Sequence, residues 1–225
     1  MLSPYPEHDV EARFAATLST ADYTLNEGSR ILRARALLVD EIVICGPPYY
    51  ASFCRRLQIT EHDIFGLWFN LVKNTLGGNG FESMFASTIT MDGRVTLKDY
   101  ETLNLQPEQV FQSFKHWAKR NVYEATLDNN HEHSDQISDS SARFGYSAEE
   151  VCRNRAFFIT KGGRLGLGST HVSPGASIYL IHGLKTPFVV HTGSGKHILR
   201  GECYVHDLMD LKASVSCQDV YLDLA

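Results

Sequence analysis

The sequence carries none of the common catalytic motifs. A G-x-S-x-G nucleophile elbow, an H-E-x-x-H zinc helix, a P-loop and the kinase motifs are all absent. The glycine-rich segment 162–168 lies between β-prone runs and does not open a helix. A dinucleotide site needs a helix N-terminus at the pyrophosphate. We therefore expect no nucleotide, flavin or other cofactor.

The chain also lacks a block of positive charge and a long apolar run. The formal net charge is −5, and no dense Lys/Arg stripe is present to neutralise phosphates, which argues against a nucleic-acid partner. No apolar run approaches the roughly 18 residues of a membrane span. The first residues lack the basic-then-apolar order of a signal peptide, so the expected location is the cytoplasm.

The cysteines are few and form no C-x-x-C pair. Their number is odd and their positions are scattered, which is typical of free thiols in a reducing compartment. Cys45, Cys54 and Cys203 are each a conceivable nucleophile, but a reactive thiol needs an electropositive neighbour that lowers its pKa. Core packing is the favoured interpretation for all three.

A metal site has one superficial candidate, the run His131-Glu132-His133 with Asp135. It falls in the stretch Asp128 to Ala142, which is polar, almost without large apolar residues and typical of a loop. Nothing in the sequence implies outer partners that would orient these ligands. We interpret the run as a solvated loop and predict no metal.

What the sequence does contain is a dense series of short β-prone segments from Asn154 to Asp210. Turn signals, most of them glycines, separate these segments every 8–12 residues or so. This spacing is typical of a compact antiparallel barrel or sandwich. The run Ile31 to Ile44 is also β-prone, and it should end at Gly46-Pro47-Pro48 because proline lacks an N–H and fixes φ.

Two amphipathic helices are predicted between these β regions. Thr60 can cap a helix over 60–76, and Pro107 can open one over 107–120. Their apolar stripes contain Ile64, Leu67, Trp68, Leu71 and Val72 in the first and Val110, Phe111, Phe114 and Trp117 in the second.

The fold class predicted from these elements is α+β. We expect a single domain over 1–225, in which a mainly helical half with one early strand (1–150) packs on a β half (151–225). The β half should be a C-terminal antiparallel β-barrel-like sheet, which the early strand completes.

An ordered series of motifs runs through the β half. It comprises Arg155, Phe157, Thr160, Gly163, Gly166-Leu167-Gly168, Gly175, Pro187-Phe188-Val189, Gly201-Glu202, Tyr204-Val205-His206 and Met209-Asp210. This series resembles the C-terminal region of fungal heterokaryon-incompatibility (HET-domain) proteins, and we expect that region to be free-standing here, without the HET domain itself. His191 stands where that pattern has arginine, and Asp207 where it has glycine.

The polar residues of the β half supply the candidate catalytic groups. Tyr204 and His206 share one face of a strand because successive side chains alternate. His191 replaces a permanent cation with a group that titrates near neutral pH. With Lys161, these three residues are our candidates for contacts to a substrate carbonyl. The alternative places Tyr204 and His206 at the barrel rim, bonded to loop backbone.

Aromatic residues of the helical half supply the candidate substrate-binding groups. We predict an apolar cavity between helices and sheet, with walls drawn from Tyr49, Tyr50, Phe53 and Trp68. Simple core packing is the alternative for these side chains.

Two functions follow from these observations. The resemblance, with the absent catalytic motifs, implies a cofactor-independent cyclase or pericyclase of fungal secondary metabolism, similar in kind to the norbornene-forming Diels–Alder cyclases of the sordarin type. Such an enzyme would catalyse an intramolecular [4+2] cycloaddition of an apolar terpenoid or polyketide. It would position the substrate and donate a hydrogen bond to the carbonyl of the dienophile. The alternative is a non-catalytic interaction or regulatory module derived from HET-domain proteins. Either protein could form a homo-oligomer.

Overall fold

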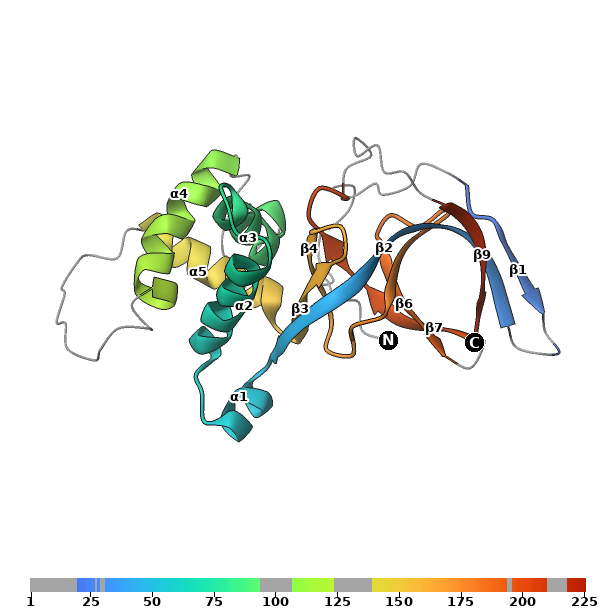
Figure 1. Ribbon diagram of the computed structural model, residues 1–225, viewed down its shortest axis with the longest axis horizontal. Helices are drawn as coiled ribbons and strands as arrows, with labels where there is room; N and C mark the ends of the chain where they lie inside the picture. The colour runs from blue at the N-terminus through green and yellow to red at the C-terminus, as the bar shows by residue number, and fades with distance from the viewer. Residues whose placement is uncertain are drawn as a thin grey trace. The chain divides into compact units, whose positions relative to one another are not determined.

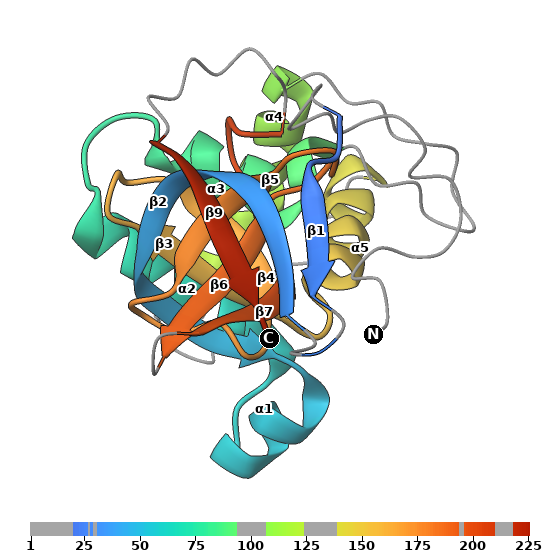
Figure 2. The same cartoon turned by 90° about the vertical axis from the view of Figure 1, so that its right-hand side faces the viewer.

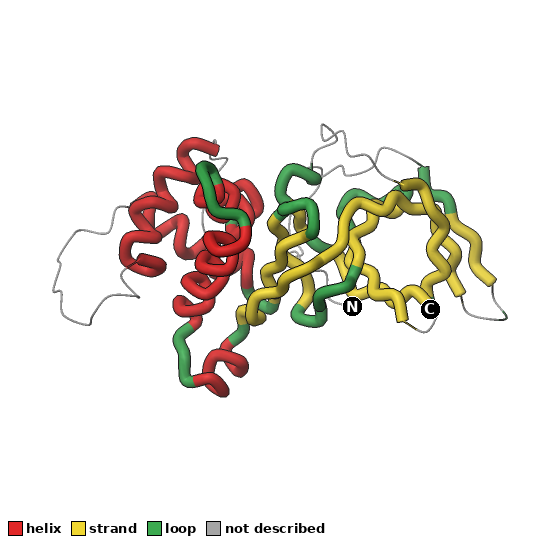
Figure 3. The backbone as a smooth tube through the Cα atoms, in the orientation of Figure 1, coloured by secondary structure: helices red, strands yellow, loops and turns green. Residues whose placement is uncertain are grey.

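The computed structural model of the protein describes residues 20–26, 28, 31–93, 107–123, 139–193, 196–209 and 218–225 (Figure 1). The chain divides into two compact units. Gly46–Arg155 form a helical unit, whereas Met1–Cys45 and Ala156–Ala225 form a β unit (Figure 3). The predicted α+β class, with a helical cluster and a barrel-like sheet, is confirmed. The single-domain organisation stays a prediction.

The helical unit contains five α-helices among its described residues. They are α1 (Ala51–Leu57), α2 (Glu61–Thr75), α3 (Phe81–Ile89), α4 (Pro107–Ala118) and α5 (Asp139–Cys152), with a 3-10 turn at Met91–Gly93 and a π-helical turn at Lys119–Tyr123. Thr60 caps α2 as predicted: its hydroxyl accepts a hydrogen bond from the Asp63 amide, and the Asp63 carboxylate accepts one from the Thr60 amide.

Aromatic side chains form the core of the helical unit. The ring of Phe114 in α4 lies within about 6 Å of the rings of Phe85, Trp117 and Phe144, which come from three helices. In α2 the buried face is Ile64, Phe65, Trp68, Phe69 and Val72. Leu67, which the sequence placed on this face, is 45% exposed. That prediction was wrong because Phe65 and Phe69, which directly follow Ile64 and Trp68, fill the core instead.

Among the described residues, the sheet of the β unit has nine strands. They are β1 (Tyr23–Asn26), β2 (Ile31–Tyr49), β3 (Arg155–Thr160), β4 (Leu165–Ser169), β5 (Ser177–Ile181), β6 (Phe188–Gly193), β7 (Lys196–Glu202), β8 (Tyr204–Val205) and β9 (Gln218–Leu224). Their order is β5-β6-β7-β9-β2-β3-β4-β8, and a further β2–β5 pairing closes β2, β5, β6, β7 and β9 into a ring, which Figure 1 shows nearly end-on. The early strand therefore joins the sheet as predicted.

The ring is not wholly antiparallel. β7 and β9 pair in parallel, with His197 opposite Leu224, whereas the described pairs β2–β5, β2–β9, β5–β6 and β6–β7 are antiparallel. A parallel contact at this seam means that the chain must cross over between β7 and β9 rather than turn back in a hairpin.

The longest strand, β2, contributes to both apolar clusters of the β unit. Ala34 and Ala36 point into a cluster built only from the ring strands, with Tyr179, Ile181 and Val190, so this cluster is the barrel interior. Beyond a bulge between Leu38 and Asp40, Ile42 belongs to a second cluster. That cluster holds Ala156, Phe158, Val172, Ala176, Ile178, Leu180, Val189, Cys203, Val205 and Leu208.

The predicted end of the early strand at Gly46-Pro47-Pro48 was wrong, since β2 continues to Tyr49. Proline removes a donor but leaves its carbonyl, and the Pro47 carbonyl accepts a hydrogen bond from Trp68 Nε1 at 2.8 Å. Gly46 permits this contact, because a Cβ there would lie 2.4 Å from the Trp68 ring.

A buried carboxylate ties β2 to the β3–β4 turn. Asp40 accepts hydrogen bonds from the Gly162 amide at 3.2 Å and from Arg164 Nη1 at 2.9 Å, and its side chain is only 9% exposed. Gly162 must lack a side chain, because a Cβ would lie 2.6 Å from the same carboxylate. The turn that carries Lys161 is thus tied to β2 by this acid and by the hydrogen bond from the Lys161 amide to the Glu41 carbonyl.

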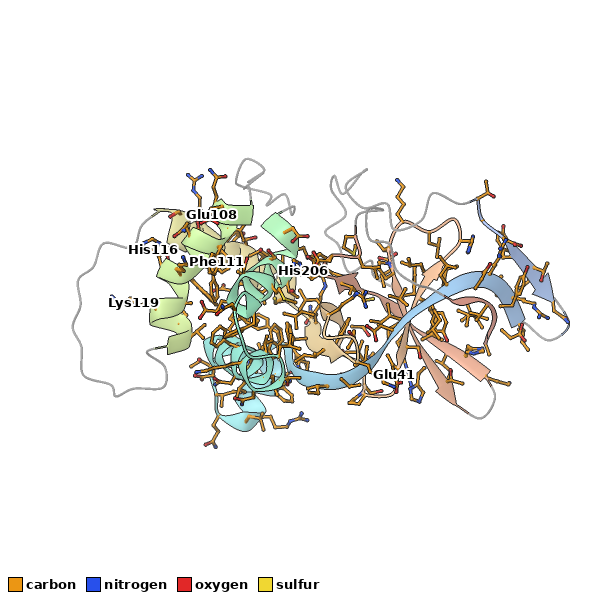
Figure 4. The ribbon with its side chains drawn as sticks, turned by 45° about the horizontal axis from the view of Figure 1, so that its top comes forward. Glu41, Glu108, Phe111, His116, Lys119 and His206 are labelled. Carbon is orange, nitrogen blue, oxygen red and sulfur yellow. The ribbon has the colours of Figure 1, made fainter. Side chains whose placement is uncertain are left out.

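Replacing Asp40 with alanine should lower the free energy of unfolding by about 1–3 kcal/mol, because Arg164 and the Gly162 amide lose a largely buried acceptor. Glu41→Ala is the matched control, since Glu41 is the exposed neighbouring acid (labelled in Figure 4) and should change stability little. Urea denaturation followed by far-UV circular dichroism measures both. Equal stabilities of the two variants would contradict the anchoring role.

Candidate functional site

Two of the candidate catalytic residues, Tyr204 and His206, meet beside the short strand β8. Its pairing with β4 sets Leu167 opposite Tyr204, and the His206 amide donates to the Leu165 carbonyl at 2.9 Å. Gly166 in β4 makes this approach possible. A Cβ at that position would lie 2.3 Å from the Phe158 ring and 2.6 Å from the Tyr204 carbonyl oxygen. The glycine of the Gly166-Leu167-Gly168 motif therefore positions the site.

The side chains of Tyr204, His206 and Asp207 form a chain of polar contacts. Tyr204 Oη lies 3.4 Å from His206 Nδ1, and His206 Nε2 lies 3.5 Å from Asp207 Oδ1. Tyr204 is fully buried, the His206 side chain is 15% exposed, and the Asp207 side chain is 78% exposed. The three groups thus lead from the interior to the surface (His206 is labelled in Figure 4).

Backbone geometry explains the residue type at Asp207. Its φ is +64°, in the left-handed region that favours glycine, the residue of the resembling pattern at this position. Aspartate is among the few other residues that adopt this conformation readily. The substitution therefore keeps the turn and adds a carboxylate next to His206.

This arrangement can present a hydrogen-bond donor at the surface. When the Tyr204 hydroxyl donates to His206 Nδ1, the neutral imidazole carries its proton on Nε2. Nε2 is the nitrogen that faces the exposed carboxylate of Asp207, at 3.5 Å. The accessible edge of His206 is therefore suited to donate to a carbonyl oxygen of a bound molecule.

The other two candidate catalytic residues lie on other elements. Lys161 is exposed in the β3–β4 turn, where its amide donates to the Glu41 carbonyl at 2.8 Å. His191 is in β6 opposite Ile198 of β7, and among the described residues its buried Nδ1 has no hydrogen-bond partner. Their predicted roles stay predictions.

The four candidate substrate-binding residues fall into two pairs within the helical unit. Tyr49 and Trp68 are buried, with ring centroids 6.2 Å apart. Tyr50 and Phe53 are partly exposed, with centroids 5.7 Å apart. The first pair belongs to the core of this unit, whereas the second remains accessible. The predicted aromatic-walled cavity stays a prediction.

Cys45 and Cys203 are unsuited to nucleophilic chemistry. Burial raises the pKa of Cys45 to about 11, and burial together with the nearby Glu202 raises the pKa of Cys203 further. Both groups are therefore protonated at neutral pH. Within the described ranges, no group of three or more His, Cys, Asp or Glu residues is arranged to hold a metal ion. The run from His131 to Asp135 lies outside those ranges.

Sequence reasoning noted Asp207 only as a departure from the pattern and missed its contact with His206. Alternation along a strand relates residues two apart but gives no contact between neighbours, and this contact depends on the left-handed turn at Asp207. The glycine of the resembling pattern at that position was the available signal.

A family model, the Het-6 beta-barrel domain, matches residues 84–222. The match covers more than half of the 225 residues, so the chain belongs to this family. It includes Tyr204, His206 and Asp207, whereas β1, β2, α1 and α2 precede it. No curated protein and no solved structure matches the chain. No helix in the described part of the chain is long and apolar enough to cross a membrane.

Proposed function

We propose that the protein is a cofactor-independent cyclase that catalyses an intramolecular [4+2] cycloaddition of an apolar polyene. The observation that carries the proposal is the Tyr204–His206–Asp207 chain, whose histidine is largely buried yet keeps an accessible edge. A donor held in such surroundings interacts more strongly with a carbonyl than the same donor in water, because the local dielectric constant is lower.

The chemistry needs no group beyond a positioned donor. The three C=C π bonds of a conjugated diene and a carbonyl-activated alkene become two new σ bonds and one new π bond, and the carbonyl π bond is unchanged. No atom enters or leaves, and no proton is transferred. A hydrogen bond from His206 Nε2 to the carbonyl oxygen withdraws electron density from the alkene, and binding both partners in one pose removes much of the entropic barrier.

The test is a cyclisation assay with a defined probe. A linear polyene that carries a conjugated diene tethered to an α,β-unsaturated aldehyde is incubated with and without the full chain. We expect faster loss of the linear compound and one product stereoisomer in excess over the spontaneous mixture. An unchanged rate and an unchanged isomer ratio for a panel of terpenoid and polyketide polyenes would reject the proposal.

A second candidate, the non-catalytic interaction module, is favoured by β1. All four residues of this strand, which Figure 2 labels, are exposed, and Tyr23 and Leu25 share one face because side chains alternate along a strand. Exposed apolar groups on a short outer strand suit pairing with a strand of another protein. Tyr23→Ser with Leu25→Ser separates the two functions: a cyclase should keep its rate, whereas an interaction module should lose its partner.

A further inference from the structure

Helix α1 carries an exposed stripe of aromatic and aliphatic side chains. Phe53 and Leu57 are four residues apart, which places them on one side of the helix, and Tyr50 is the extended residue that precedes its first turn. The rings of Tyr50 and Phe53 are in contact, and Leu57 is 50% exposed. Cys54 is buried instead. The helix therefore anchors itself through Cys54 and leaves its larger apolar groups accessible.

The same segment carries positive charge and no negative charge. From Ile42 to Thr60 the chain contains Arg55 and Arg56 but no aspartate or glutamate. Both arginines are exposed, and the Arg56 guanidinium lies 5.3 Å from the centre of the Phe53 ring. This local excess of cations contrasts with the formal net charge of −5 for the whole chain.

These features together suit an anionic lipid surface. Aromatic side chains and half-exposed leucines insert at the boundary between headgroups and acyl chains, and arginines bind the phosphates above it. The aliphatic stem of arginine can lie along the apolar layer while its guanidinium stays at the headgroups. In both Figure 1 and Figure 2, α1 stands apart from the other helices of its unit.

We propose that α1, with Tyr50, Phe53, Arg55, Arg56 and Leu57, docks the protein peripherally on membranes that contain anionic lipids. An acidic protein surface would match the two arginines, but it would not need three accessible apolar groups in line with them. The docking goes beyond the proposed cyclase function and does not depend on it. A membrane is also the place where an apolar polyene would concentrate.

The experiment is co-sedimentation of the full chain with two kinds of vesicle, phosphatidylcholine alone and phosphatidylcholine with phosphatidylserine. We expect binding to the second kind that weakens as salt is added, because exposed charges are screened. Arg55→Gln with Arg56→Gln should weaken this binding about thirtyfold, given the contribution of each basic residue near such a surface. Lys73→Gln with Lys119→Gln removes the same charge from two exposed lysines of the helical unit and should have little effect.

The apolar part of the stripe has its own matched pair. Leu57→Gln should weaken vesicle binding about fivefold, whereas Leu67→Gln, at a similarly exposed leucine in α2, should leave it unchanged. Tryptophan fluorescence confirms that each variant is folded. Equal weakening by the lysine control, or full binding by both α1 variants, would overturn the proposal. If the wild-type chain binds neither kind of vesicle, the proposal is also overturned, and an acidic protein becomes the expected partner of α1.

Discussion

Replacing Phe114 with alanine should destabilise the helical unit by about 3–5 kcal/mol. Phe114 is fully buried, and its ring contacts aromatic rings from α3, α4 and α5, so truncation leaves a cavity that its rigid neighbours cannot close. The two tryptophans of the chain, Trp68 and Trp117, both lie in this unit. Their fluorescence during urea denaturation therefore reports on its unfolding separately from the β unit.

Leu67→Ala provides the matched control for this measurement. It truncates a large apolar side chain of the same unit, but one that is half exposed, so the expected change is well below that of Phe114→Ala. Similar losses for both variants would mean that the core is not centred on the aromatic cluster. A two-state analysis applies only to the tryptophan signal, because two units can unfold in separate transitions.

The second large effect is expected at His206. If this residue donates to the carbonyl in the proposed cycloaddition, His206→Ala should slow turnover about 10²- to 10³-fold, as the loss of one oxyanion-hole donor does. The protein should stay folded, since the side chain reaches the surface. The cyclisation assay with the polyene probe measures the rate, and the melting temperature checks the fold.

Three further variants separate donation from positioning. Tyr204→Phe removes the contact at Nδ1, so it should lower the rate less than His206→Ala, because the donor remains but loses the partner that fixes its tautomer. Asp207→Gly keeps the left-handed turn without strain and deletes only the carboxylate. His191→Ala tests the remaining histidine, which lies on another strand. If His191→Ala, Tyr204→Phe and His206→Ala all keep the wild-type rate, these three residues have only structural roles and the proposed site is rejected.

The sequence predicted which helices and strands form better than it predicted where they end and how the strands pair. Apolar residues that recur at every second position, or at every third or fourth position, show which face of a strand or helix is apolar. These patterns located β2, the β region from Arg155 onward, α2 and α4. They did not place the end of β2, because a proline is tolerated where its missing N–H is not needed, as at Pro47 and Pro48. The parallel β7–β9 pair depends on a contact between distant segments, which no local pattern encodes.

The candidate site shows the same division. The alternation of side chains along a strand predicted that Tyr204 and His206 lie on one face, and their side chains are in contact. β8 is nevertheless only two residues long, and His206 lies in the turn that follows it. The aromatic residues were chosen by type alone, and type does not distinguish a buried ring such as Trp68 from an accessible one such as Phe53. Burial depends on the whole fold, so this distinction required the structure.

The closed ring of strands has a consequence for the order in which the chain acquires its structure during synthesis. The helical unit is one uninterrupted segment, so it is complete once Arg155 has left the ribosome. The ring joins β2, near the start of the chain, to β9, near its end, with Leu32 opposite Leu224. Until β9 emerges, β2 exposes an unpaired edge beside an already folded neighbour. Slow synthesis of the last strands should therefore favour aggregation through β2, and a chaperone that covers this edge should relieve it.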